Sequence, residues 1–292
     1  MHDTIDKNKE IPPVSISVVI ATYYRHDTLK DVLSNFEKQT TVPEEFIIVD
    51  QTPEKDRPKG FYEGYDLNIK LFTPDQPSMT GSRNLGAKEA KEDYLLIIDD
   101  DIVFQENYVE MYKKVLSEEQ ADVINGGTTL KKELPKDWPW DIKDMDPVRF
   151  FLAAPNHQWK GMQLSVSSCN FLIKRELFLE TGGFDLNCPR MADFEYGYRL
   201  YKFGAKIIYS DLPWCQHLRA GGGLRKKSFR NAALVGAIYI HKKHFPGWIT
   251  KQFILKQILR LKVIYRPWLL AKLFIAYIDA LQFLRANNKS SS

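Results

Sequence analysis

Three consecutive carboxylates, Asp99, Asp100 and Asp101, follow the apolar run 94–98. If that run is a strand, Asp99 and Asp101 point to one side of its end and Asp100 points to the other. Adjacent carboxylates repel each other, so a cation or hydrogen-bond donors must compensate for them. Mg²⁺ and Mn²⁺ take oxygen ligands and commonly bridge carboxylates to substrate phosphates. The triplet is therefore a candidate divalent-metal site, with a solvated acidic turn as the alternative.

The elements that must position this triplet alternate between apolar, β-branched runs and helical patterns. Such alternation, with acidic or hydroxyl residues at strand ends, predicts an α/β fold with a parallel sheet, which binds ligands at the carboxyl ends of its strands. In the first half we expect strands over 16–21, 46–49, 69–72 and 94–98 and helices after residue 27 and over 83–91. In the second half we expect strands over 121–128, 164–173 and 206–209 and a helix over 191–203.

Charge is distributed unevenly along the 292 residues, although the formal net charge is only +4 and the apolar content of 44% allows a full core. From Arg225 to the end there are 14 Lys and Arg and one acid, Asp279, which leaves 27 basic and 36 acidic residues before that point. The body therefore carries about −9 and the tail about +13, which favours an anionic partner for the tail. Composition does not distinguish nucleic acid, anionic lipid and an acidic protein surface.

The cysteines and the N-terminus indicate the compartment. Cys169, Cys188 and Cys215 fit neither a disulfide framework nor a paired zinc pattern, so we expect unpaired, buried thiols in a reducing environment. The first ten residues lack the apolar run of a signal peptide. No stretch of about 20 uncharged apolar residues predicts a spanning helix. We therefore expect a cytoplasmic protein.

Six segments of the chain resemble family 2 glycosyltransferases, in the order and with the spacing of that family. They are ISVVIATYYR, FIIVDQT, GSRNLG, YLLIIDDDIVF, ETGGFD and MADFEYGYRL, and the resemblance covers about residues 15–220. It implies the GT-A fold, in which a mixed, mainly parallel central sheet binds a nucleotide-diphosphate sugar. It also implies an inverting transfer of that sugar to an acceptor hydroxyl, dependent on a divalent metal such as Mg²⁺ or Mn²⁺.

On the donor side, the resemblance implies that Thr22 and Asp50 contact the nucleotide base, with Asp50 accepting a hydrogen bond from a ring N–H. Arg83 corresponds to a residue near the nucleotide or diphosphate. We expect Arg83 to open the helix after Gly81, where a cation and a helix N-terminus both suit an anionic ligand. The alternatives are polar strand ends for Thr22 and Asp50 and an ordinary surface arginine for Arg83.

Around the metal, the resemblance implies that Asp99 and Asp100 approach the ribose and the metal shell and that Asp101 is the direct ligand. His217 follows the last predicted strand of the body, where the family often places a histidine on the metal or the diphosphate. A neutral imidazole is a suitable ligand, and a structural histidine is the alternative.

The general base is expected in the segment after Gly183. The family usually has a Glu-Asp pair here, whereas this chain has Ala192-Asp193. Asp193 matches the base position, and Glu195 is the nearest substitute. Asp185 either orients the acceptor or closes the turn. Two roles are equally consistent with the acceptor-side tryptophans, Trp138, Trp140 and Trp159. They stack on sugar rings, or they anchor a long loop.

The tail contains two amphipathic helical patterns separated by Pro267. The first is carried by Ile254, Ile258, Leu261 and Tyr265, and the second by Leu270, Phe274, Tyr277, Leu281 and Leu284. These helices pack on the body or on a second subunit, or they bind an anionic membrane surface beside a glycan or lipid-linked acceptor. Nucleic-acid binding is disfavoured because no recognised module accompanies the basic residues.

The expected organisation is a polar segment over 1–14, a GT-A catalytic domain over 15–224 and a basic helical tail over 225–292. Within the catalytic domain we place the nucleotide-binding half at about 15–105 and the acceptor half at about 106–224. A nucleotidyltransferase is disfavoured because the loop after the first strand, TYYRHDT, is not glycine-rich. A catalytically inactive nucleotide-sugar-binding scaffold remains the alternative, because the glutamate of the family's acid pair is missing.

Overall fold

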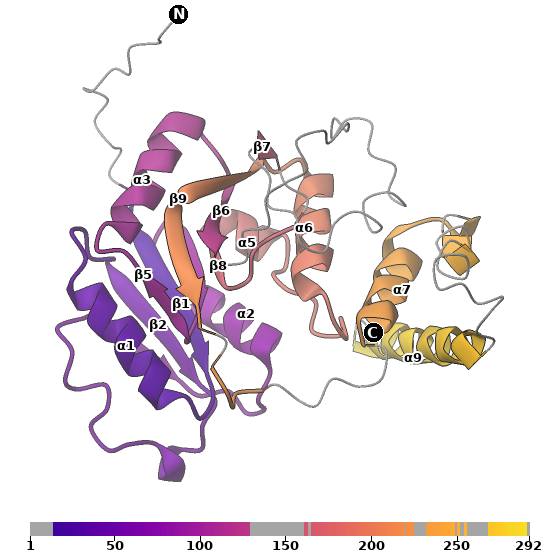
Figure 1. Cartoon of the computed structure of the whole chain (residues 1–292), viewed down its shortest axis with the longest axis horizontal. Helices are drawn as coiled ribbons and strands as arrows, with labels where there is room; N and C mark the ends of the chain where they lie inside the picture. Colours follow the sequence, from indigo (N-terminus) through magenta and orange to yellow (C-terminus); the bar gives the residue numbers. More distant parts are fainter. Residues whose placement is uncertain are drawn as a thin grey trace, which may run out of the picture. The chain divides into compact units, whose positions relative to one another are not determined.

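A computed structural model describes residues 14–128, 161–162, 165–218, 220–224, 232–248, 250–251, 254–255 and 268–290. Within these residues, nine strands form one mixed sheet in the order β3-β2-β1-β4-β8-β6-β9-β5, with β7 paired to β9 (Figure 1). The strands are β1 Ile16–Thr22, β2 Glu45–Asp50, β3 Ile69–Phe72, β4 Tyr94–Asp99, β5 Ile102–Phe104, β6 Val123–Thr128, β7 Gly161–Met162, β8 Asn170–Lys174 and β9 Ile207–His217.

The first four strands are parallel, which confirms the strands expected in the first half of the chain. Residues of β1 and β2 are buried on both faces, as their continuous apolar sequences require in a sheet covered on both sides. The register pairs Thr22 with Asp50 and Ala21 with Asp99. The carboxyl ends of β1, β2 and β4 therefore lie together at one edge of the sheet.

The other strands bring later parts of the chain to the same region. β8 runs antiparallel to β4, with Asn170 opposite Ile98, and β9 runs antiparallel to β5, with His217 opposite Ile102. The strand expected over 164–173 begins only at Asn170, whereas the one expected over 206–209 continues to His217. β9 is longer because its last residues, which are not an apolar run, pair with β5.

Within the first unit, helices cover both faces of the sheet. The described helices of the chain are α1 His26–Glu37, α2 Met79–Glu89, α3 Tyr108–Glu119, α5 Arg175–Glu180, α6 Ala192–Phe203, α7 Ala232–His244 and α9 Trp268–Ser290, and η1 Glu54–Asp56 is a single 3₁₀ turn. Alternate β1 residues, Ile16, Val18 and Ile20, share a core cluster with α1 and α3. Val19 points to the opposite face, where α2 packs so closely that a Cβ on Gly86 would lie 2.5 Å from a Val19 methyl.

Helix α2 begins four residues before the expected start at Arg83. Ser78 caps it by accepting the Gly81 N–H at 3.1 Å, so Gly81 lies inside the helix and does not precede it. Arg83 consequently sits in the second turn. The expectation that Arg83 opens the helix is wrong, because the cap at Ser78 starts the helix before Gly81.

Contacts divide the chain into two compact units. The first contains the whole sheet with α1, α2, α3 and α5. The second contains residues 184–196, which include the start of α6, together with the described residues after 224. The tail therefore shares a unit with the segment that carries Asp193.

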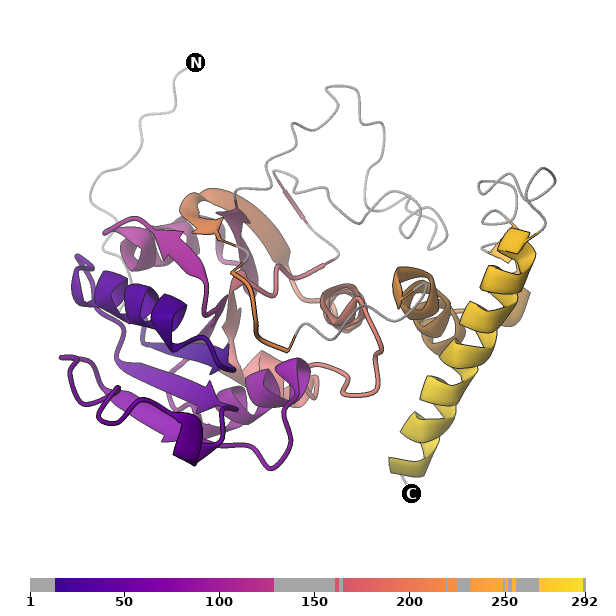
Figure 2. The same ribbon diagram turned by 60° about the horizontal axis from the view of Figure 1, so that its bottom comes forward.

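Within the second unit, α7 and α9 pack against each other (Figures 1 and 2). The buried side of α9 consists of Leu273, Ala276 and Ala280, whereas Leu270 and Phe274 of the expected apolar stripe are exposed. The small alanine side chains explain this shift, because they allow the two helix backbones to approach closely. The described helices include none with the length and apolarity needed to cross a membrane.

Candidate active site

The acidic triplet lies where β4 ends, and its three carboxylates differ in exposure. Asp99 closes the strand and keeps 24% of its side chain exposed, whereas Asp101 is fully buried. Asp100 is also buried, and the Thr22 hydroxyl at the end of β1 donates to its Oδ2 at 2.8 Å. Asp99 is thus the carboxylate of the triplet that a ligand reaches most easily.

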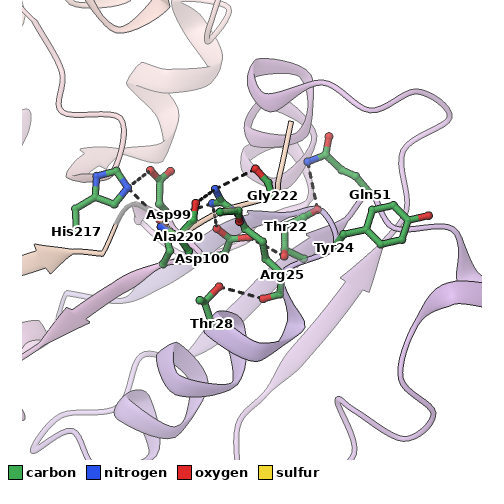
Figure 3. Close-up of polar contacts among 12 residues, drawn as sticks. Thr22, Tyr24, Arg25, Thr28, Gln51, Asp99, Asp100, His217, Ala220 and Gly222 are labelled. Atoms are coloured by element: carbon green, nitrogen blue, oxygen red, sulfur yellow. Dashed lines mark hydrogen bonds and ion pairs between the residues drawn. The ribbon is translucent and has the colours of Figure 1, made fainter. Parts of the chain in front are cut away.

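Arg25, at the start of α1, supplies positive charge that three adjacent carboxylates require (Figure 3). Its Nη1 lies 2.9 Å from Asp100 Oδ1 and 3.3 Å from Asp101 Oδ2. Arg25 is not among the site residues predicted from the sequence. The signal was available, because an arginine three residues after the strand end at Thr22 is well placed to meet the acidic residues on the neighbouring strand.

Arg25 also holds the segment that follows β9. Its Nη2 donates to the Ala220 carbonyl at 2.8 Å and its Nε donates to the Gly221 carbonyl at 3.2 Å. Gly223 has φ +67°, and a Cβ there would lie 2.8 Å from Arg25 Nε, so the guanidinium and a side chain at this position exclude each other. Ala220 N–H in turn donates to Asp101 Oδ2 at 2.9 Å. One guanidinium therefore links the acidic triplet to the glycine segment.

These contacts set the charge of the triplet. Burial raises the pKa of Asp100 to about 6, although Thr22 and Arg25 oppose the rise. Burial also raises the pKa of Asp101, but its contact with His217 and the charges of His217 and Arg25 outweigh burial and lower it overall. Asp101 is therefore an ionised carboxylate in a fully buried position.

His217 ends β9 and faces the triplet, as Figure 3 shows. Its Nε2 lies 3.0 Å from Asp101 Oδ1 and 3.6 Å from Asp99 Oδ2. Contacts with Asp101 and then Cys169 raise the pKa of His217 to about 10, against the opposing effect of burial. The structure thus brings His217 to the acidic triplet, and without a bound cation the imidazole is protonated.

Asp50 is fully buried at the end of β2, and both of its oxygens already have donors. The Thr52 N–H donates to Oδ1 at 2.9 Å. Oδ2 lies 2.9 Å from both His26 Nε2 and the Tyr62 hydroxyl and 3.2 Å from Arg57 Nε. In this arrangement Asp50 organises three side chains around itself and offers no exposed surface to a base.

Arg83 and Gln51 connect α2 to the strand ends. Arg83 Nη2 donates to Asp99 Oδ1 at 2.5 Å. Gln51 donates from Nε2 to the Thr22 carbonyl at 3.3 Å and accepts the Ser78 N–H at 2.7 Å. Thr22, Arg83, the acidic triplet and His217 therefore form one connected group, whereas Asp50 belongs to the neighbouring cluster of His26, Arg57 and Tyr62.

The residues present suit a divalent cation. In the described part of the chain, one trio of possible ligand atoms, from Asp99, Cys169 and His217, lies within a mutual distance of 4.8 Å. Asp101 lies outside that trio but contacts His217, and its buried Oδ1 receives no hydrogen bond of good geometry. An oxygen, a nitrogen and a sulfur donor beside a second buried carboxylate match the ligand chemistry of divalent transition-metal ions.

The two candidate bases, Asp193 and Glu195, differ in their surroundings within the second unit. Glu195 is fully buried, and its Oε1 lies 2.9 Å from both Lys243 Nζ and His244 Nε2. Asp193, in the first turn of α6, is only partly buried. Asp185 accepts from the Tyr239 hydroxyl at 2.6 Å and from Lys243 at 2.7 Å.

The acceptor-side tryptophans, Trp138, Trp140 and Trp159, lie outside the described residues.

Comparison with known proteins identifies relatives of the chain. A family model described as glycosyl transferase family 2 matches residues 17–182. The uncharacterized glycosyltransferase YwdF of Bacillus subtilis is 34% identical over 252 residues, which cover 82% of this chain and 88% of that protein. The glucosyl-dolichyl phosphate glucuronosyltransferase of Haloferax volcanii is 25% identical over 189 residues, which cover 62% of this chain and 59% of that protein.

A solved structure shares the fold. The mannosyltransferase PcManGT of Pyrobaculum calidifontis, in complex with GDP-Man and Mn²⁺, superposes with a TM-score of 0.57 at 16% identity. The match covers 96% of this chain and 76% of that one.

Proposed function

Because the chain belongs to glycosyl transferase family 2 and has the GT-A fold, we propose that this glycosyltransferase moves a sugar from a nucleotide-diphosphate donor to an acceptor hydroxyl with inversion. One observation carries the proposal. Thr22, Arg83, the acidic triplet and His217 meet at the carboxyl ends of the parallel strands, where such sheets bind ligands. The acceptor is a saccharide or a lipid-linked glycan.

On the donor side, Arg83 supplies a buried positive charge for the diphosphate. Asp50 accepts from the ring N–H of the base only if one of its present donors moves. The Thr52 N–H is fixed by the backbone, so the side chain that moves is His26, Arg57 or Tyr62. If none moves, Asp50 acts on the base indirectly by fixing these three side chains.

His217 and the carboxylates of Asp99 and Asp101 would hold a divalent cation, Mg²⁺ or Mn²⁺. When bound, such an ion stabilises the negative charge that develops on the departing nucleoside diphosphate. His217 would hold the ion as a neutral imidazole, so the proton on its ligating nitrogen would pass to the solvent. Asp101 needs to exchange its contacts with Arg25 and Ala220, whereas Asp99 is accessible without rearrangement of those two residues.

Asp193 is the general base. It accepts the proton of the acceptor hydroxyl while that oxygen forms a bond to the anomeric carbon and the bond from this carbon to the diphosphate oxygen breaks. Attack from the face opposite the leaving group inverts the configuration. Glu195 is unsuited to the role because its buried carboxylate is already paired with Lys243 and His244.

The tail places the enzyme at the cytoplasmic face of a membrane. Its net charge of about +13 suits anionic lipid, and α9 exposes Leu270, Phe274 and Ile278, which share one helix face because they are four residues apart. The name of the Haloferax relative, which refers to a dolichyl phosphate substrate, supports a lipid-linked acceptor. Packing against a second subunit is the competing role for this surface.

The function is tested first by thermal unfolding of the full chain with UDP, GDP or TDP, with and without Mn²⁺. A bound ligand at 100 times its Kd stabilises the fold by about 2.7 kcal/mol. We expect one nucleotide to raise the melting temperature, and to do so more strongly with Mn²⁺. Hydrolysis of the matching nucleotide sugars then reports catalysis. Binding without hydrolysis or transfer would indicate an inactive scaffold, and no stabilisation by any nucleotide would contradict the proposed donor.

A further inference from the structure

Cys169 lies in the loop immediately before β8, and three strands bring it to the acidic triplet. Because β8 runs antiparallel to β4 with Asn170 opposite Ile98, Cys169 comes next to Asp99, whose N–H donates to the Cys169 carbonyl at 3.4 Å. His217 arrives from β9. Ligand atoms of Asp99, Cys169 and His217 consequently lie within 4.8 Å of one another, although the residues are far apart in the sequence.

A second observation, at Asp101, also points to a cation at this group. Asp101 Oδ1 is completely buried and accepts no hydrogen bond of good geometry, yet it lies 3.0 Å from His217 Nε2. A buried carboxylate oxygen in this state is costly unless a positive charge approaches it. A metal ion held by His217 would bring a positive charge close to this oxygen.

We propose that Cys169 is a further ligand of this divalent cation, beside Asp99 and His217. The inference rests on the metal dependence proposed above and adds a sulfur donor to it. On binding, the Sγ–H bond is replaced by a bond from Sγ to the ion, and the proton leaves to the solvent. Carboxylate and water suit Mg²⁺, whereas thiolate and imidazole suit softer ions. The site therefore favours ions such as Co²⁺ and Zn²⁺ over Mg²⁺.

The experiment is a titration of the full-length protein with CoCl₂, followed by absorption spectroscopy. A thiolate bound to Co²⁺ gives a charge-transfer band in the near ultraviolet, whereas oxygen and nitrogen ligands give only the weaker visible bands. We expect the band in the wild type and its loss in Cys169→Ser. The variant should still bind Co²⁺, but with an affinity at least about tenfold lower. Loss of even an outer-shell partner of a metal site typically lowers metal affinity by about that factor. In competition, Mg²⁺ should displace Co²⁺ from Cys169→Ser at lower concentration than from the wild type.

Cys188→Ser and Cys215→Ala are the matched controls. Cys188 belongs to the second unit, and Cys215 is buried in the core cluster of the first. Both variants should keep the band. A band that persists in Cys169→Ser, or Co²⁺ binding by the wild type without any band, would overturn the role of Cys169 and leave the metal dependence intact. Failure of the wild type to bind Co²⁺ with or without UDP and GDP would overturn both.

Discussion

At the scale of single residues, several neighbouring cationic groups together offset the negative charge of the acidic triplet. Arg25 pairs with Asp100 and Asp101, Arg83 pairs with Asp99, and His217 lies between Asp99 and Asp101. The site thus exists as a balanced charge network before any ligand binds. Changes to individual members should separate their contributions to stability, to metal binding and to catalysis.

Loss of Arg25 should destabilise the protein. Arg25→Ala leaves the buried Asp100 without its cation, leaves Asp101 with His217 alone and removes the donor to the carbonyls of Ala220 and Gly221, so we expect the free energy of unfolding to fall by about 3 kcal/mol. Urea unfolding without metal measures this change. Lys30→Ala, at an exposed position of the same helix, serves as the control and should change stability by less than about 0.5 kcal/mol. Equal stability of Arg25→Ala and the control would show that the guanidinium is not needed to offset the negative charge of Asp100 and Asp101.

The two outer carboxylates of the triplet should differ in their effect on metal binding. Asp99→Asn should weaken Mn²⁺ binding, because Asp99 is the exposed carboxylate of the triplet and is available to an ion without a change in the contacts of Arg25 and Ala220. Asp101→Asn should also abolish the extra stabilisation that Mn²⁺ gives in the presence of nucleoside diphosphate, if Asp101 is the direct ligand. Thermal unfolding with and without Mn²⁺ distinguishes the two variants. Unchanged Mn²⁺ dependence in Asp101→Asn would remove Asp101 from the metal site and leave Asp99 as its carboxylate.

Asp193 should affect transfer and not donor binding. Asp193→Asn keeps the shape of the side chain but cannot accept a proton, so we expect the rate of transfer to fall by about 10²–10⁴-fold. Stabilisation by the donor nucleotide should remain as in the wild type, because the donor does not need the proton acceptor. Turnover close to that of the wild type would assign the base to another carboxylate.

At the scale of secondary-structure elements, a charge cluster around the buried Glu195 connects α7 to the segment 185–195 within the second unit. Lys243 lies 2.7 Å from Asp185 Oδ2 and 2.9 Å from Glu195 Oε1, and His244 contacts the same Glu195 oxygen. A chain that ends at Gly223 would therefore lose Lys243 and His244, the cationic groups that contact these carboxylates. Tests of the tail must use point substitutions in the full chain.

Lys243→Met should lower the free energy of unfolding by about 3–5 kcal/mol, because it leaves Asp185 and Glu195 buried without their shared cation. Lys242→Met is the matched control, since the neighbouring Lys242 lies over the Tyr277 ring at 5.4 Å and pairs with no carboxylate in the contacts described above. We expect a loss there of only about 0.5–1 kcal/mol. Urea unfolding measures both changes. Similar losses in the two variants would mean that the cluster adds little to the packing of α7.

At the scale of the whole molecule, positive charge is concentrated after residue 224 while the rest of the chain is acidic. Each Lys or Arg near an anionic lipid surface contributes about 1 kcal/mol, so several together can hold the protein at a membrane reversibly. The exposed apolar side chains of α9 add a hydrophobic contribution that salt does not screen. These two contributions can be separated experimentally.

The full chain should co-sediment with anionic vesicles at low salt, dissociate as salt is added and bind neutral vesicles poorly. The double variant Phe274→Ser and Ile278→Ser should bind anionic vesicles several-fold more weakly, because it removes two exposed apolar side chains from α9. Leu186→Ser, at an exposed apolar position outside α9, is the control and should bind as the wild type does. Absence of binding to anionic vesicles at low salt would favour packing or dimerisation as the role of the tail.

The sequence by itself determined the strands of the parallel half, the position of the acidic triplet and the family. These features are local: a β-branched apolar run becomes a buried strand wherever it lies in a sheet, and polar residues at its end reach the ligand edge. The start of α2 differs from the prediction because the Ser78 hydroxyl caps the helix through one hydrogen bond from the Gly81 N–H. The exposed face of α9 was misjudged because its packing uses alanines.

The tertiary structure alone decided which distant residues complete the site. Arg25 meets the carbonyl of Gly221, 196 residues away, and Cys169 meets Asp99 and His217 because three strands pair in one particular register. The contact of Asp50 with a base stays a prediction, and only the structure shows that His26 of α1 and Arg57 and Tyr62 of the loop after β2 surround its carboxylate. Such contacts depend on strand order and register, which are set by the packing of the whole sheet and leave no periodic signal in the sequence.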